Sequence, residues 1–155
     1  MRQEAYCAGV CVWGLEAKFQ CVRGVVDTQV GYAGGTTKDP TYRQVCQETT
    51  GHAETVKIVF EPEVISFQQL LELFFSYHDP TTCCSQGLDF GSQYRSMVFY
   101  TTAEEKEIIE QVIAFLEVSG VFERPVVTQV EMLERFYPAE EYHQNYYRKH
   151  GVSLC

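Results

Sequence analysis

The 155-residue sequence has few basic side chains and no long apolar run. Lysine and arginine total 12 against 21 aspartates and glutamates, so the formal net charge is -9. Binding to nucleic acid or to an anionic membrane surface needs positive charge, so we expect neither kind of partner. No apolar stretch approaches the ~20 residues of a membrane helix, and the N-terminus lacks the apolar core of a signal peptide.

Internal repeats, low-complexity tracts and Pro/Ser-rich linkers are also missing from the sequence. We therefore expect residues 1–155 to form one domain. A chain of this length buries roughly two-thirds of its unfolded surface, so it does not need disulfides in order to fold. Nothing in the pattern indicates an obligate oligomer, and we expect a monomer.

Cysteine is the unusual component of the composition. There are seven: Cys7, Cys11, Cys21, Cys46, Cys83, Cys84 and Cys155. An odd number cannot pair completely within one chain, and no secretory signal is present. The pattern is typical of a reducing compartment, so we expect a cytoplasmic protein with mostly free thiols.

The hydrophobic pattern predicts alternating strands and helices. Strands are expected over 3–7, 25–32, 55–60, 95–100 and 126–131, and helices over 13–24, 66–77, 102–119 and 139–149. Two of the helices begin with a capping box, at Ser66 and at Thr102. This order predicts an α+β fold, a two-layer α/β sandwich of split βαβ (ferredoxin-like) type with long loops. The loop over 78–93 is long enough to suggest a functional role.

Cys11 lies between the first predicted strand and the first predicted helix. Unpaired backbone N–H groups and the helix dipole favour a thiolate at such a position, which makes the sulfur a nucleophile. Trp13, the only tryptophan, would lie beside that sulfur. The alternative is a small buried side chain that happens to precede a helix.

Other polar side chains fit the same chemistry. Glu54 is in phase with Val56 and so should point toward the apolar layer, where a carboxyl group keeps its proton and can act as an acid. The alternative is an ordinary glutamate facing solvent at the strand end. Tyr42 and Tyr94 offer phenolic donors, although packing alone would also explain them. Asp89 fits a helper carboxylate or a simple turn residue.

Two further motifs do not indicate a function. Cys83-Cys84 with His78 lacks two paired C-x-x-C units, and adjacent cysteines rarely bind one metal ion, so we expect no metal. Gly31-Tyr-Ala-Gly-Gly35 is not a phosphate-binding loop, because no G-K-[ST] follows it.

Together these segments resemble the A-type peptide methionine sulfoxide reductase family over nearly the whole chain. Cys11-Val-Trp-Gly-Leu-Glu16 is similar to the catalytic block G-C-F-W-G-x-E. The other matching blocks follow in order: Val30-Gly-Tyr-Ala-Gly-Gly35, Gly51-His-Ala-Glu54, His78-Asp-Pro-Thr-Thr82, Gln93-Tyr-Arg-Ser96 and Pro138-Ala-Glu-Glu-Tyr-His-Gln-Asn-Tyr-Tyr147. Several blocks in the correct order are far more specific than any one of them.

The resemblance implies reduction of methionine-(S)-sulfoxide, free or in proteins. Cys11 would attack the sulfoxide sulfur and Glu54 would protonate its oxygen, leaving methionine and a Cys11 sulfenic acid. The residues implied to hold the oxygen or to bound the methyl pocket are Tyr42, Asp89, Tyr94, Val12 and Trp13.

The resemblance also implies how the enzyme is recycled. A cysteine near the C-terminus, here Cys155, would attack the sulfenic acid, and thioredoxin or another dithiol would reduce the resulting disulfide. Cys83 and Cys84 are alternatives for this resolving role. The other three cysteines, Cys7, Cys21 and Cys46, are expected to be small packing residues. No metal or bound organic cofactor is implied.

Three positions depart from the family pattern. Val10 stands where glycine is usual, Val12 where phenylalanine is usual, and Cys83-Cys84 where Leu-Asn is usual. The smaller side chain at position 12 predicts a looser methyl pocket or a different sulfoxide. Two alternatives therefore stay open: a divergent enzyme acting on another sulfoxide or sulfur substrate, and a thiol-based redox sensor or metal-binding module.

Overall fold

The computed structural model describes residues 2–9, 12–47, 50–82, 85–86, 89–90 and 94–151. Several positions with an expected role lie outside these residues: Val10, Cys11, Cys83, Cys84, Cys155 and the side chain of Asp89. The remaining candidates, among them Trp13, Tyr42, Glu54 and Tyr94, are described.

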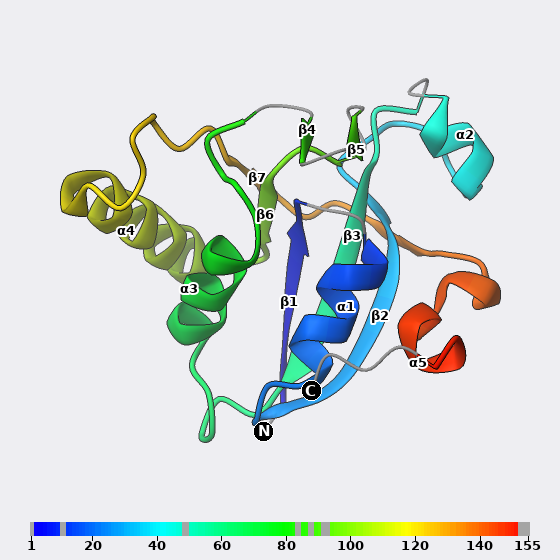
Figure 1. Ribbon diagram of the computed structural model, residues 1–155, viewed down its shortest axis with the longest axis horizontal. Coiled ribbons are helices and arrows are strands. Elements are labelled where there is room, and N and C mark those ends of the chain that lie inside the picture. The colour runs from blue at the N-terminus through cyan, green and yellow to red at the C-terminus, as the bar shows by residue number, and fades with distance from the viewer. Residues whose placement is uncertain are drawn as a thin grey trace.

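A six-stranded sheet forms the centre of the molecule, in the order β7-β6-β1-β3-β2-β8 (Figure 1). The strands are β1 (Gln3–Ala8), β2 (Val25–Ala33), β3 (Ala53–Phe60), β6 (Met97–Tyr100), β7 (Gln129–Met132) and β8 (Phe136–Pro138). Neighbouring strands are antiparallel except β6 and β7, which are parallel. A separate two-stranded ladder joins β4 (Ser85–Gln86) to β5 (Asp89–Phe90) within the segment expected to be a loop. The predicted mixed α+β class is confirmed.

The helices of the described residues are α1 (Val12–Gln20), α2 (Tyr42–Cys46), α3 (Phe67–Tyr77), α4 (Ala103–Ser119), the 3-10 helix η2 (Glu141–His143) and α5 (Tyr146–Lys149). Of these, α1 contacts β2 and β3, and α4 contacts β6 and β7. In Figure 1, α1 crosses in front of β3 and β2, and α3 and α4 lie together beside the sheet. The main core joins Leu15 and Phe19 of α1 to Phe74 of α3 and Ile58 of β3. None of the helices in the described part of the chain is long and apolar enough to cross a membrane.

The two faces of the sheet bury different residues. Alternate side chains of β1, Ala5 and Cys7, enter the main core, whereas Ala8 belongs to a smaller cluster. That cluster contains Ala8, Ala33, Ala53, Met97 and Phe99, with Tyr6 and Leu133 packed against it. The period of two in a strand therefore separates a thick helical layer from a thin layer closed by the chain near Leu133.

The expected capping boxes have different outcomes. At the start of α3, Gln69 N donates to Ser66 Oγ at 3.1 Å and Ser66 N donates to Gln69 Oε1 at 2.9 Å, so this box is confirmed. At the start of α4, Glu105 N donates to Thr102 Oγ1 at 3.1 Å. The Glu105 carboxylate accepts instead from Thr101 N at 2.7 Å, which shifts the reciprocal bond by one residue.

The helix expected over 139–149 is wrong. The chain breaks into η2 and α5 because Gln144 is extended and Asn145 takes a left-handed φ of 53°. The Gln144 amide binds the backbone of β2 as a strand would, accepting from Val30 N at 2.9 Å and donating to Val30 O at 2.8 Å. Binding to β2 outweighs the local helical pattern, and β8 just before it was not expected.

Candidate active site

The segment that precedes α1 packs against a histidine side chain. Gly9 lies against His78: a Cβ atom at position 9 would come within 2.8 Å of His78 Cδ2. His78 Nδ1 donates to Phe74 O at 2.8 Å, so Nε2 accepts from Ser96 Oγ at 2.7 Å. Burial lowers the pKa of His78 to about 4, which keeps the ring neutral and matches these bonds. Two residues after Gly9 comes Cys11, directly before Val12 at the first position of α1.

Trp13, in the first turn of α1, contacts the last part of the chain. Its Nε1–H donates to His143 Nδ1 at 3.1 Å. Its ring stacks on Tyr146 with 3.8 Å between centroids and 8° between planes. The preceding Val12 is only 4% exposed and belongs to the main core.

Glu54 is the buried carboxyl group of the candidate site. It is 2% exposed and lies in β3 directly opposite Tyr32 of β2, so the expectation of a buried side chain is confirmed and the solvent-facing alternative is wrong. Burial raises the pKa of Tyr42, and a hydrogen bond with Cys46 and the charges of Glu54 and Tyr94 raise it further. Tyr42 therefore lies within electrostatic range of both Glu54 and Tyr94.

A second carboxylate, Glu140, links β2 to α2. Its Oε1 accepts from the Tyr32 hydroxyl at 3.1 Å, and its Oε2 accepts from Tyr42 N at 3.1 Å. Burial alone would raise the pKa of Glu140, but hydrogen bonds from its own backbone and from Tyr42 and Tyr32 lower it overall. Glu140 is therefore an anchor that fixes where α2 begins.

A third carboxyl group, Glu16, fixes the C-terminal segment to α1. It is 1% exposed and accepts from Thr28 Oγ1 and from Asn145 N, both at 2.8 Å. Burial raises the pKa of Glu16, while these hydrogen bonds act in the opposite direction. Gln20 Nε2 adds bonds to Asn145 Oδ1 at 2.6 Å and to Thr28 Oγ1 at 3.0 Å.

His143 connects the tryptophan to the tyrosines. It is 2% exposed, its ring centroid lies 4.3 Å from that of Tyr42, and its Nε2 has no hydrogen-bond partner among the described residues. The sequence pattern predicted no role for His143, Glu140 or Tyr146, although all three fall in its C-terminal block. His143 and Trp13 are 130 residues apart in the sequence, so no local pattern could predict their contact. The only available sign was the number of aromatic residues in the C-terminal block.

The described cysteines differ from one another. Cys7 is 1% exposed, and burial raises its pKa to about 12, so its assignment as a packing residue is confirmed. Cys46 is a free thiol but exposed, so the same assignment is wrong there. It is also wrong for Cys21, which is disulfide-bonded.

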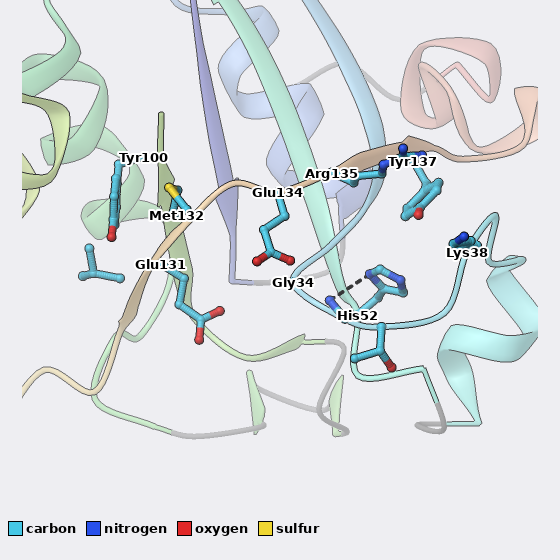
Figure 2. Close-up of a pocket in the computed structure, with 12 residues that line it drawn as sticks. Gly34, Lys38, His52, Tyr100, Glu131, Met132, Glu134, Arg135 and Tyr137 are labelled. Atoms are coloured by element: carbon cyan, nitrogen blue, oxygen red, sulfur yellow. Dashed lines mark hydrogen bonds between the residues drawn. The ribbon is translucent and has the colours of Figure 1, made fainter. Parts of the chain in front are cut away.

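A pocket of about 790 Å³ lies apart from these residues (Figure 2). Its walls come from the turn after β2, from β7 and from the chain leading to β8. The lining residues include His52 and the charged side chains of Lys38, Glu131, Glu134 and Arg135. His52 is already occupied, because Nδ1 accepts from Gly35 N at 3.0 Å and Nε2 lies 2.7 Å from Thr37 O. None of the proposed catalytic residues that the structure describes lines this pocket.

Metal binding finds no support in the described part of the chain. There, no group of three or more His, Cys, Asp or Glu side chains is placed to hold a metal ion.

Comparison with known proteins identifies the family. The family model described as "Peptide methionine sulfoxide reductase" matches residues 3–155. The MsrA of Trichodesmium erythraeum is 52% identical over 91% of this chain and 80% of its own. The MsrA of Acidobacterium capsulatum is 48% identical over 100% of this chain and 99% of its own.

Solved structures agree with these relatives. Reduced Mxr1 from Saccharomyces cerevisiae has a TM-score of 0.91 and 31% identity, over 99% of this chain and 88% of its own. Mxr1 in complex with Trx2 is 22% identical with a TM-score of 0.65, over 94% and 84% of the two chains, which shows likeness of fold alone. With a family match over almost its whole length and relatives near 50% identity, this chain belongs to the peptide methionine sulfoxide reductase family and reduces methionine sulfoxide.

Proposed function

We propose that the chain reduces the S epimer of methionine sulfoxide, with Cys11 as nucleophile and Glu54 as acid. The observation that carries this proposal is the buried Glu54 carboxyl group, whose charge raises the pKa of Tyr42, as the charge of Tyr94 also does. Contacts lead from this group to the start of α1: the Tyr42 ring packs on His143, and His143 binds Trp13. Trp13 is two residues after Cys11.

The chemistry of a sulfoxide suits these groups. The Cys11 thiolate attacks the electrophilic sulfur, a proton from Glu54 goes to the oxygen as the S–O bond breaks, and the oxygen ends on Cys11. The products are methionine and a Cys11 sulfenic acid, so one sulfur is reduced and the other is oxidised. Tyr42, Tyr94 and Asp89 would donate or relay hydrogen bonds to the oxygen as its charge grows.

The indole of Trp13 would form the wall against the substrate methyl group. Its orientation is fixed by His143 at the edge and by Tyr146 on the face. Val12, which is 4% exposed, would close the base of this pocket, and Tyr94 would lie on the oxygen side. A valine at position 12 leaves more room than the phenylalanine usual in the family.

The test of this function is an epimer assay. Purified protein is incubated with the separate S and R epimers of methionine sulfoxide and with dithiothreitol, and methionine release is measured. We expect turnover of the S epimer and at least ~100-fold slower turnover of the R epimer, since a site built around one oxygen position rejects the other. Turnover of other sulfoxides only would favour the divergent enzyme, and none at all would favour a sensor.

We also propose recycling by thioredoxin, with Cys155 as the resolving cysteine and Cys83 and Cys84 as alternatives. Support comes from the yeast relative solved with a thioredoxin and from the cysteines themselves. The sulfenic acid would lose water to a second thiol, and the disulfide so formed would accept two electrons from a dithiol. No bound cofactor is needed in this scheme.

Cys155→Ser separates the first turnover from recycling. We expect one equivalent of methionine per enzyme in a single turnover, but at least ~10-fold slower steady-state turnover with thioredoxin, because the oxidised Cys11 then lacks its partner thiol. Cys21→Ser is measured in parallel, because the disulfide of Cys21 could undergo thiol–disulfide exchange with the disulfide formed by Cys11.

The disulfides present after one round of reduction are mapped by mass spectrometry. Unchanged recycling in Cys155→Ser would move the role to Cys83 or Cys84.

The domain organisation, the fold type, the cellular location and the oligomeric state are part of the same proposal. The family match over residues 3–155 supports a single reductase domain. The antiparallel strand order β6-β1-β3-β2 supports the split βαβ kinship. The exposed free thiol of Cys46 supports a cytoplasmic location, because a reducing compartment preserves such a thiol, whereas the disulfide of Cys21 departs from the mostly free thiols expected. The oligomeric state that we propose is a monomer.

A further inference from the structure

Two contacts restrain the indole of Trp13, a ring stacking and a hydrogen bond, and each restrains a different motion of the ring. Stacking on Tyr146 fixes the plane of the indole, with 8° between the rings, but leaves it able to turn within that plane. The bond from Nε1 to His143 Nδ1, at 3.1 Å, lies at the edge of the ring and removes that freedom. The edge of the indole that faces the site therefore depends on His143.

The bond also fixes the tautomer of His143. An indole N–H only donates, so Nδ1 must be the unprotonated nitrogen and Nε2 carries the proton of the neutral ring. Burial lowers the pKa of His143, against the charge of Glu140, and so favours this neutral form. A charged imidazole would place a second donor opposite the indole and break the bond.

His143 itself is firmly placed. Its ring centroid lies 4.3 Å from that of Tyr42 and 4.0 Å from that of Tyr142. Its backbone N donates to Glu140 O at 2.9 Å, and the next residue, Gln144, binds both backbone groups of Val30. The imidazole cannot follow a displaced indole, so it acts as a fixed reference for it.

We propose that His143 is a positioning residue for the reductase. Through Nδ1 it sets the orientation of Trp13, and through Trp13 it sets the shape of the methyl pocket. The inference rests on the proposed role of Trp13 in that pocket. It asks His143 neither to contact the substrate nor to transfer a proton.

A pair of isosteric variants tests the bond. In His143→Asn the amide oxygen can take the place of Nδ1, whereas in His143→Gln the amide reaches the place of Nε2 and leaves the indole without an acceptor. Because the chain has one tryptophan, its fluorescence reports Trp13 alone. The matched control is His150→Gln: His150 is exposed and stacks on Tyr146 at 4.0 Å from the other end of the segment.

We expect His143→Gln to differ from the other two variants in its fluorescence and in its KM. His143→Gln should shift the emission maximum and raise KM for methionine sulfoxide about tenfold, with kcat within about threefold, as one lost hydrogen bond in a binding wall predicts. His143→Asn and His150→Gln should keep the emission and hold KM within about twofold. In a Trp13→Phe background, which removes the donor, His143→Gln should leave KM unchanged.

Several results would overturn the inference. They are unchanged emission in His143→Gln, shifted emission with unchanged KM, and an equal defect in His143→Asn. If His143→Gln does not fold, His143→Asn tests the inference instead. A tenfold rise in the KM of His143→Asn would contradict the positioning role of His143. Failure of the proposed function is distinguishable, because the wild-type chain would then release no methionine while its fluorescence would still report the bond.

Discussion

Replacing Cys11 by serine is expected to abolish reduction of methionine sulfoxide. Cys11 directly precedes Val12, the first residue of α1, where unpaired N–H groups and the helix dipole favour an anion. A serine hydroxyl is far harder to deprotonate and attacks sulfur poorly, so the rate should fall at least ~1,000-fold. Methionine release in a single turnover with dithiothreitol measures this loss directly.

Cys46→Ser is the matched control for Cys11→Ser. Cys46 is a free thiol on an exposed residue. Partial desolvation of its sulfur raises its pKa, although the hydrogen bond with Tyr42 acts the other way. It should therefore be a poor nucleophile at neutral pH. We expect activity within about threefold of wild type. Full activity in Cys11→Ser, or loss of activity in Cys46→Ser alone, would contradict the assignment of Cys11 as nucleophile.

Three features of the structure followed from local sequence signals. The start of α1, the Ser66 capping box and the in-phase position of Glu54 each depend on residues within one turn or one strand. Periodicity and capping are local properties, so the sequence alone is enough to predict them. Burial of Glu54 is the site feature that the strand pattern predicted best.

The C-terminal wall of the site depends on distant contacts and was not predictable. Its pattern reads as one helix over 139–149, but Glu16 and Val30 bind Asn145 and Gln144 and break it. That break turns His143 and Tyr146 toward Trp13. Tertiary hydrogen bonds overrode a helix preference worth only tenths of a kcal/mol per residue, as is common for short segments.

The disulfide pairing of the cysteines was also not predictable from the sequence. Cys21 looked like a packing residue, because its only local feature is a position after α1. Cys21 is disulfide-bonded, and the local sequence gives no sign of such a pair. Exposure and bonding separate Cys7, Cys21 and Cys46, which composition treats alike.

Replacing Glu54 by glutamine is expected to lower kcat by ~100- to 1,000-fold with little change in KM. The amide keeps the shape and burial of the side chain, which is 2% exposed, but it cannot give up a proton when the S–O bond breaks. Loss confined to kcat indicates a group that acts in the transition state rather than in substrate binding. The rate of sulfenic acid formation in a single turnover measures it without interference from recycling.

Glu4→Gln provides the control for this substitution. Glu4 lies on β1 next to β3, is exposed, and pairs with Lys57 at 2.9 Å, so its loss should cost at most about 1 kcal/mol of stability and leave kcat unchanged. A wild-type single-turnover rate in Glu54→Gln would move the acid to a tyrosine. Tyr42 is the weaker choice, because burial raises its pKa and its hydroxyl already bonds with Cys46. Tyr94→Phe would then be the decisive variant, because the hydroxyl of Tyr32, which lies opposite Glu54, already donates to Glu140 and Tyr94 is the other tyrosine proposed to bind the oxygen.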